Sequence, residues 1–144
     1  MAYEEAHAVA VAMGDDQHIA MLLGCLSFLA DHAGDYAEAR LLASDALRLS
    51  WSAGHRTTAA ESPVQLAGPE LGLGHPDRAA RLLGASEEAL RVLGGHIGQG
   101  DAHEQARLVA GLQAALAPEE LDRLRTEGAR LSLEEAVELA LTAP

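Results

Sequence analysis

The sequence predicts an all-α protein built from stacked helical hairpins, and three observations support this. Ala and Leu dominate the composition and aromatic residues make up only 3%, a bias that favours helices over strands. Apolar residues recur at steps of three and four along most of the chain. Glycines recur every forty residues in two series, a period typical of arrays in which each helix pair buries its apolar face against the next. The two series are Gly14, Gly54 and Gly94, and Gly34 and Gly74.

The first two helices are predicted from the glycines that follow them. An amphipathic helix over 2–13 ends at Gly14, because glycine is a common C-terminal cap. A second helix runs to about residue 33, with Asp15 or Asp16 accepting free backbone N–H groups at its start. The buried stripe predicted for this second helix comprises Ile19, Leu22, Leu23, Leu26, Phe28, Leu29 and Ala30.

The next two segments continue the period. Asp35 is expected to cap a helix over 36–52, which Gly54 follows. The segment 55–73 takes the next place but carries Pro63 and Pro69. Since an interior proline removes a backbone hydrogen bond at a cost of about 3 kcal/mol, this helix is expected to be broken, kinked or split. The inward residues predicted for 36–52 are Ala39, Leu42, Ala43, Ala46, Leu47 and Leu49.

A further helix begins at Pro76, which suits a first helical turn, and reaches about residue 93. The glycine-rich segment 94–100 is a predicted loop. After it come helices over 101–116 (Ala106, Val109, Leu112 and Leu116 inward), 118–128 (Leu121 and Leu124 inward) and 133–142.

The last of these helices starts with a capping box made by Ser132 and Glu135. The chain therefore divides into two predicted parts. Residues 1–93 form the repeats, the first of them incomplete and the second degenerate at Pro63 and Pro69, and residues 94–144 form a helical cap.

Charge and composition exclude several classes of partner. The net charge is −12 and all ten cationic residues are arginines, which argues against binding of nucleic acid or of an anionic membrane surface. The chain has no apolar run long enough to cross a bilayer and no signal-peptide pattern, so a cytoplasmic location is expected.

Catalytic, metal and cofactor chemistry are not predicted. No two of the seven histidines lie four residues apart on one predicted helix, so the spacing of a helical zinc motif is missing. Cys25 is the only cysteine, which excludes an internal disulfide, and its apolar surroundings predict a small buried side chain. Adjacent carboxylates such as Glu87 and Glu88 diverge by about 100° on a helix and cannot face one another as an acid–base pair.

The stretch LSFLADHAGDYAEARLLASDAL (26–47) resembles the tetratricopeptide pattern. Ser27 takes the small position of the first helix, Gly34 the turn, Tyr36 the aromatic position, and Ala39 and Ala46 the small positions of the second helix. The period exceeds the usual ~34 residues, as in the extended repeats of the maltose-regulator-like group.

The strings AARLLGA (79–85) and LSLEEAVELAL (131–141) resemble the closing segment of large bacterial transcriptional regulators. These are ATP-binding activators of the LuxR-like and antibiotic-regulatory-protein-like types, and the same segment follows some nucleotide-cyclase domains. The chain itself has no phosphate-binding loop ending in Gly-Lys-Ser/Thr. The resemblance implies a fragment or truncated descendant of such a regulator, acting in signal transduction.

The resemblance also implies a binding face, since repeat arrays bind on the concave side lined by their first helices. Phe28 and Met21 would be apolar anchors there, while Asp31 and Glu61 would contact a polar or basic feature of a partner. The alternative is that Phe28 and Met21 are core residues packed on a neighbouring helix. The positions implied for this face are Met21, Gly24, Phe28, Asp31 and His32 in one repeat and Glu61, Val64, Gly68 and Leu71 in the next.

The predicted function is a non-catalytic protein-interaction or effector-sensing module of a bacterial transcriptional regulator. Its partner would be another protein or other domains of the regulator. One alternative is a free-standing adaptor or dimerisation module that forms a homodimer. Another is a small all-α enzyme, which would need a polar pocket around His32, Asp31 and Glu61.

Overall fold

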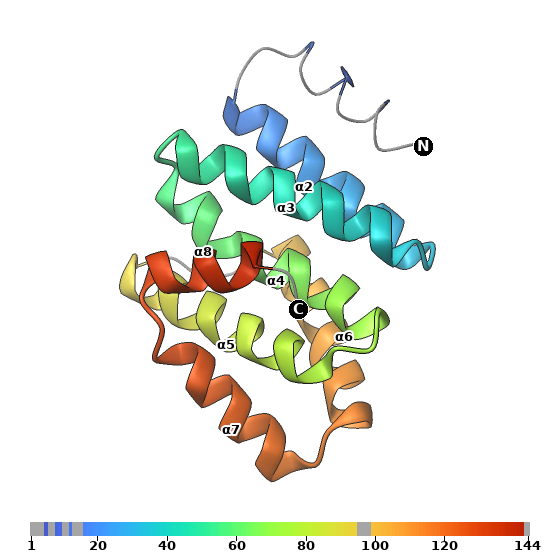
Figure 1. The fold of residues 1–144 in the computed structure, drawn as a ribbon, viewed down its shortest axis with the longest axis vertical. Coiled ribbons are helices and arrows are strands. Elements are labelled where there is room, and N and C mark those ends of the chain that lie inside the picture. Colours follow the sequence, from blue (N-terminus) through green and yellow to red (C-terminus); the bar gives the residue numbers. More distant parts are fainter. Residues whose placement is uncertain (1–4, 6–7, 10–11, 13–15, 95–98, 143–144) are drawn as a thin grey trace.

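The computed structural model describes residues 5, 8–9, 12, 16–94 and 99–142. Within these ranges the chain forms seven helices and no strand (Figure 1), so the all-α prediction is confirmed. The helix predicted over 2–13 and its glycine cap lie almost wholly outside the described residues. Among the helices that the structure describes, none has both the length and the apolar character needed to cross a bilayer.

Four helices of 17 residues each follow one another at a constant interval. They contact one another in sequence order, α2 on α3, α3 on α4 and α4 on α5. Since three-residue connections join them, the four form an up-and-down stack. Their bounds are α2 (Asp16–His32), α3 (Tyr36–Ser52), α4 (Arg56–Gly72) and α5 (Pro76–Val92).

The glycines of the period end these four helices, as predicted. Gly34, Gly54, Gly74 and Gly94 have φ values of 74–89°, and no residue other than glycine in the described part has a positive φ. The residue after each of the first three donates its N–H to a carbonyl five residues earlier, at 2.8–2.9 Å. This bond defines the Schellman motif, which requires a left-handed residue at the turn. The following N-cap, Asp35, makes no side-chain capping bond, contrary to the expectation for it.

The break or split expected in 55–73 is wrong, because α4 is one uninterrupted helix that contains Pro63 and Pro69. The kink expected there stays a prediction. Both proline rings are fully buried, and α4 contacts α3 on one side and α5 on the other. Burial of apolar surface on both sides offsets the hydrogen bonds that the prolines remove.

Buried serines join neighbouring helices within the stack. The Oγ of Ser27 in α2 donates to the carbonyl oxygen of Ala39 in α3 at 2.8 Å, and the Oγ of Ser86 in α5 donates to that of Ala60 in α4. Small side chains at these positions let the helix backbones come close, as the sequence pattern predicted for Ser27 and Ala39.

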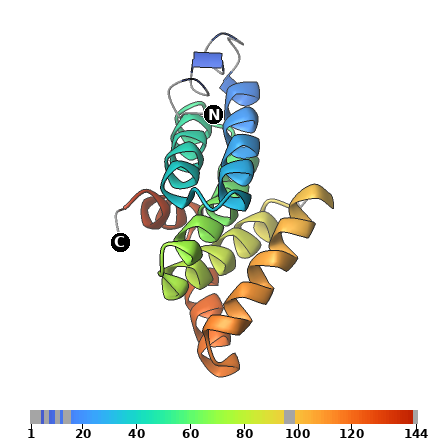
Figure 2. The ribbon, with the colours of Figure 1, turned by 90° about the vertical axis from the view of Figure 1, so that its right-hand side faces the viewer.

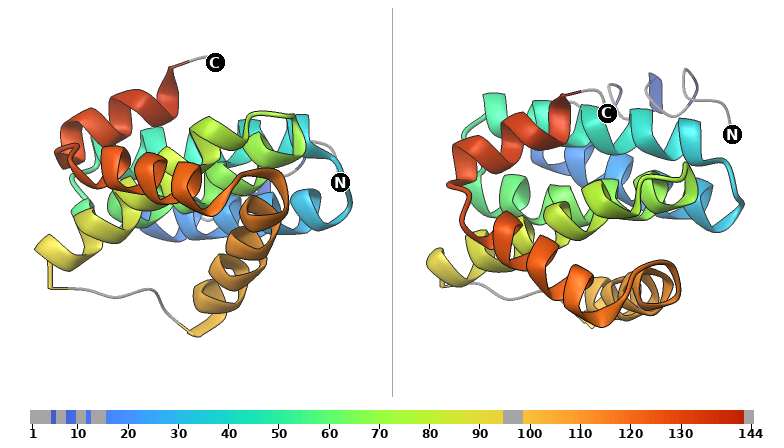
Figure 3. Two further views of the ribbon diagram at one scale, coloured as in Figure 1. Left: turned by 90° about the horizontal axis from the view of Figure 1, so that it is seen from below. Right: turned by 60° about the horizontal axis from the view of Figure 1, so that its bottom comes forward.

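The sequential stacking ends after α5. The next helix, α6 (Gln99–Ala115), makes only minor contacts with α5, whereas α7 (Pro118–Ala129) packs extensively along it. Figures 1 and 3 show that α7 runs in the same direction as α5, unlike the alternating helices before it. At Gly84 and Gly128 there is no room for a Cβ between the two helices.

The remaining helices lie on opposite sides of the stack (Figure 2). The short α8 (Leu133–Leu141) packs on α3, α4 and α5, and its predicted capping box between Ser132 and Glu135 is present. On the other side, α6 contacts α4, α5 and α7. A single cluster of buried apolar side chains includes residues on both sides of residue 94, and the division of the chain at that position stays a prediction.

Three predicted burial assignments are wrong. Leu29 is 67% exposed, and Cys25 and Ala106 are exposed as well. The first two lie on α2, which packs on α3 through Ile19 and Leu23. Because α2 is the first helix of the stack in the described part, its opposite face has no comparable neighbour there.

A buried carboxylate links three helices of the stack. Glu70 of α4 is fully buried, with Arg40 of α3 at 2.8 Å and Arg78 of α5 at 3.3 Å. These contacts are ion pairs, since neither Glu70 oxygen has a well-aligned hydrogen bond. Arg78 also donates to the carbonyl oxygens of Ala140 and Thr142, which fixes the end of α8. Burial lowers the pKa of Arg78, and the charge of Glu70 opposes that shift.

Candidate functional site

A pocket of about 290 Å³ lies between α2, α4 and α6, close to the start of α3. Its volume is near the lower end of the range of small-molecule sites, about 300–1,000 Å³. The walls combine apolar and aromatic side chains with four polar ones. The lining residues are Phe28, Asp31, Tyr36, Val64, Gln65, Gly68, Leu71, Gly72, Glu104, Arg107, Leu108 and Gly111.

Glycines on α4 make room for the polar side of this pocket. A Cβ at Gly68 would lie 2.7 Å from a carboxylate oxygen of Asp31, and one at Gly72 would lie 2.5 Å from the ring of Tyr36. These two glycines are four residues apart and therefore share one helix face. The absence of side chains on that face lets Asp31 and Tyr36 lie directly over α4.

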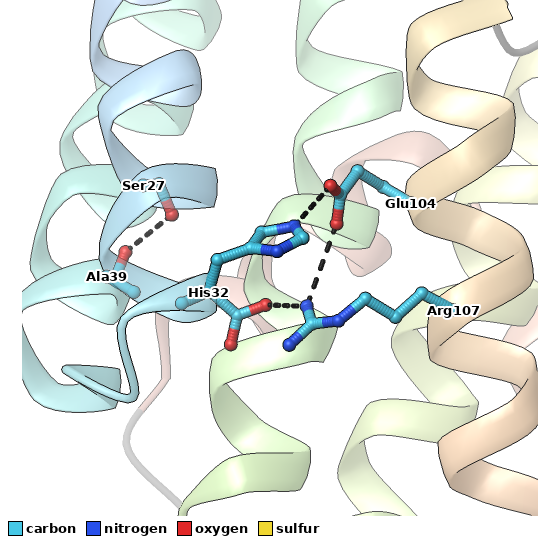
Figure 4. A network of polar contacts seen from close by, with 6 residues as sticks. Ser27, His32, Ala39, Glu104 and Arg107 are labelled. Atoms are coloured by element: carbon cyan, nitrogen blue, oxygen red, sulfur yellow. Dashed lines mark hydrogen bonds and ion pairs between the residues drawn. The ribbon is translucent and has the colours of Figure 1, made fainter.

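An ion pair and a hydrogen bond connect α2 to α6 at the pocket (Figure 4). An Nη of Arg107 donates to Asp31 Oδ2 at 2.9 Å and lies 3.7 Å from Glu104 Oε2. The other oxygen of Glu104 lies 2.5 Å from Nε2 of His32. The chain thus brings together groups that are 72 and 76 residues apart in sequence.

The two ends of the Asp31–Arg107 pair differ in exposure. The side chain of Asp31 is 5% exposed, whereas that of Arg107 is 45% exposed. A buried carboxylate needs a cationic or hydrogen-bonding partner, while a half-exposed guanidinium can be hydrated in its place. Loss of the pair would therefore cost more free energy at Asp31 of α2 than at Arg107 of α6.

Gln65 adds an unused acceptor to the pocket wall. Its Oε1 is buried and has no hydrogen-bond partner among the described residues. The side-chain amide lies beside Gly24 of α2, where a Cβ would approach its Nε2 to 2.7 Å. Buried polar atoms are satisfied in the large majority of cases, so this oxygen marks a place where a donor is missing.

The structure brings together most of the residues predicted for the concave face. Phe28, Asp31 and Val64 line the pocket, as do Gly68 and Leu71. His32 pairs with Glu104, and Gly24 packs against the amide of Gln65.

Two of the predicted residues lie elsewhere. Met21 is 55% exposed, which excludes the alternative that it is a core residue, and neither it nor Glu61 is among the lining residues. Phe28 is half-buried on the pocket wall, so its side chain belongs to the pocket and to the packing around it.

The residues that sequence reasoning missed come mostly from α6. Glu104, Arg107, Leu108 and Gly111 form the outer wall of the pocket, although α6 belongs to the predicted cap. Glu104 and Arg107 are three residues apart on one helix, a spacing that usually indicates a solvated ion pair. Only the placement of α6 against α2 gives this pair another role, and no local signal in the sequence indicates that placement.

The polar side chains that line this pocket are two carboxylates, one guanidinium and one amide. Within the residues that the structure describes, no group of three or more His, Cys, Asp or Glu side chains could hold a metal ion. Comparisons of the chain with protein-family models, with curated proteins and with solved structures found no match. The features of this chain that bear on its function are therefore the all-α stack and the pocket.

Proposed function

We propose that this chain is a non-catalytic effector-sensing or protein-interaction module of tetratricopeptide type, working in the cytoplasm as part of a bacterial transcriptional regulator. The observation that carries the proposal is the pocket between α2, α4 and α6. Phe28, Asp31 and Val64, three residues expected on a concave binding face, line it together. Repeat arrays bind their ligands on that face.

The way α6 is held suggests how binding would be transmitted. Among its described side chains, only Leu108 and Leu112 are buried. Its contacts with α2 include those of Glu104 with His32 and of Arg107 with Asp31. A ligand in the pocket would change these contacts and shift α6 relative to the stack. In a complete regulator, that shift would bias an ATPase or DNA-binding domain elsewhere.

Binding is favoured over catalysis by the state of the charged groups. Asp31 and Glu104 are both engaged with Arg107, and His32 is engaged with Glu104. Glu61, the third member of the acid–base group that an enzyme would need here, is not a lining residue. A general base has to reach its substrate directly or through one water molecule.

Two-dimensional NMR of the 144-residue chain tests this function. A library of metabolites and short peptides would be added, and backbone shift changes are expected to cluster around Phe28, Val64 and Leu108. Val64→Trp fills the pocket and is expected to abolish these changes, whereas Met21→Trp, on an exposed position, is the matched control and keeps them. Shift changes confined to other surfaces, or turnover of a library compound, would contradict the proposal.

A second candidate function, self-association, is favoured by a separate observation. Met21, Cys25 and Leu29 are spaced four residues apart on α2 and are all exposed, which places an apolar stripe on one face. Contiguous exposed apolar surface marks association sites. Sedimentation velocity over a hundredfold concentration range is expected to show a dimer that Leu29→Glu abolishes and Leu41→Glu, at another exposed leucine, does not. A monomer at every concentration contradicts this candidate.

A further inference from the structure

We propose that the pocket between α2, α4 and α6 binds a small organic cation, an ammonium or guanidinium head on an apolar body, which takes the place of Arg107 at Asp31. The inference rests on the proposed effector-sensing function and names the ligand class for the same site. Four features of the pocket carry it: its charge, its replaceable cation, its unused acceptor and its apolar wall.

The pocket has an excess of negative charge. Asp31 and Glu104 contribute two carboxylates and Arg107 one guanidinium, so the charged lining residues carry a formal net charge of −1. The whole chain carries −12. A cationic ligand is therefore attracted both by the pocket and by the surface around it.

The cation already at Asp31 is suited to exchange. The Asp31 carboxylate is 5% exposed and bound by Arg107 at 2.9 Å, yet Arg107 itself is 45% exposed. A released guanidinium would be hydrated at little cost, whereas Asp31 needs a positive partner at all times. A ligand with a cationic head supplies that partner and leaves no buried charge unpaired.

The second acceptor lies on the same side of the pocket. Gln65 and Gly68 are three residues apart on α4 and share one helix face, and Asp31 lies over Gly68. The Gln65 amide lies further along this wall, beside Gly24, and its partnerless Oε1 is an acceptor in addition to the Asp31 carboxylate. An ammonium or guanidinium group has several donors and no acceptor, which matches this pair.

The rest of the wall accommodates an apolar body. Phe28, Val64, Leu71 and Leu108 line it, with the ring of Tyr36. The volume of about 290 Å³ suits a ligand with one ring and a short chain. Aromatic faces also attract cations within about 6 Å of the ring centroid, so the two aromatic residues are compatible with a charged head.

Release of Arg107 would remove one of the ion pairs that join α6 to α2. The contact between Glu104 and His32 would remain. The ligand therefore weakens the attachment of α6 to α2, and this is the structural change by which effector binding would be transmitted.

Isothermal titration calorimetry with three probes that share a 2-phenylethyl body tests the inference. The cation 2-phenylethylammonium is compared with neutral 2-phenylethanol and anionic 3-phenylpropionate on the full chain. The cation is expected to bind at least tenfold more tightly than the alcohol, and the anion not to bind. Equal binding of cation and alcohol, or no binding of the cation at millimolar concentration, overturns the inference.

Variants test whether the ligand is recognised through its cationic head or merely occupies the pocket. Arg107→Ala removes the competing cation and is expected to tighten binding of 2-phenylethylammonium severalfold, whereas a merely structural role for Arg107 predicts weaker binding. Gln65→Leu is expected to weaken it about tenfold, and Asp31→Asn to abolish it, with folding of each variant checked by circular dichroism. If other compounds shift the NMR signals of the pocket while cations do not, the effector-sensing function stands and this ligand class fails.

Discussion

Gly84 of α5 and Gly128 of α7 let the two helices touch backbone to backbone. A Cβ on Gly84 would lie 2.0 Å from the carbonyl oxygen of Arg125, and one on Gly128 would lie 2.0 Å from that of Arg81. Real Cβ contacts are not that short, and a backbone carbonyl within a helix cannot rotate away. An ion pair between Glu87 and Arg125, at 2.9 Å, flanks the crossing.

Gly84→Ala is accordingly expected to destabilise the protein, by about 1–3 kcal/mol as for other overpacked sites, despite the better helix propensity of alanine. The free energy of unfolding from urea titration measures the effect. Gly111→Ala is the matched control, because the atom its Cβ would meet is the end of the Leu71 side chain, at 2.7 Å. That side chain can move, and alanine gains up to about 1 kcal/mol over glycine in a helix, so little net change is expected. Equal losses in the two variants would contradict this account.

Glu70→Gln is expected to cost about 3–5 kcal/mol, the range observed when one partner of a buried ion pair is removed. The substitution keeps the side-chain shape but leaves Arg40 and Arg78 without their shared anion, and Arg78 is only 11% exposed. Urea titration again provides the measurement. The comparison is Glu88→Gln, which removes an exposed pair with Arg91 on one helix and is expected to change nothing beyond error. A neutral result for Glu70→Gln would show that the buried charge is dispensable.

The pair of Asp31 and Arg107 is expected to couple energetically across α2 and α6. A double-mutant cycle with Asp31→Asn and Arg107→Ala should give about 1 kcal/mol, a modest value because the guanidinium is 45% exposed. Hydrogen exchange in α6 should also accelerate in both single variants. Strictly additive effects, with α6 exchange unchanged, would mean that this pair does not hold α6.

Glu135 makes the docking of α8 sensitive to acid. The Glu135 carboxylate accepts a hydrogen bond from the backbone N–H of Ser132 at 3.0 Å. This bond is the main cause of a Glu135 pKa below its ordinary value of 4.5, and the hydrogen bond with the Ser132 side chain is the second cause. The folded pKa is thus lower than the unfolded one. The contribution to stability is fully present above about pH 4.5 and is lost as the pH falls through the folded pKa.

Unfolding midpoints between pH 7 and pH 3 measure this dependence. Glu135→Gln keeps a neutral capping box and is expected to flatten the acid limb of the curve relative to the natural chain. Ser132→Ala removes the cap altogether and is expected to cost about 0.5–2 kcal/mol at neutral pH. Parallel acid limbs for the natural chain and Glu135→Gln would assign the acid sensitivity to other groups.

Cys25 is expected to react with Ellman's reagent in the folded monomer at a rate near that of a free thiol, because its side chain is exposed. The matched control moves the thiol two residues along α2, with Ser27→Cys in a Cys25→Ser background. Ser27 is fully buried against α3, so the relocated thiol should react only on unfolding. Protection of Cys25 in the natural chain would indicate that another surface covers this face of α2.

The parts of the fold that the sequence predicted are those governed by local chemistry. Helix ends followed from glycines such as Gly34 and Gly74, because a left-handed residue is needed wherever a Schellman turn closes a helix. The capping box at Ser132 was equally local. Each of these features depends on a few consecutive residues, which is why the pattern alone located them.

The parts that were missed depend on contacts between distant segments. The prolines of α4 were expected to break it, since the penalty is local while the compensating burial against α3 and α5 is not. Five pocket residues on α2 and α4 were among those predicted from the repeat pattern, but Arg107 meets Asp31 across 76 residues. No periodicity in the sequence encodes that meeting, because α6 lies outside the forty-residue register.

The Gly84–Gly128 crossing also makes the two ends of the stack different. With α7 seated along α5 at backbone contact, the flank of α5 away from α4 is closed to any further hairpin. The outer face of α2, with Met21 and Leu29 exposed, has no such seal within the described residues. Additional forty-residue units could therefore join this array only beside α2, so that lengthening would proceed in one direction.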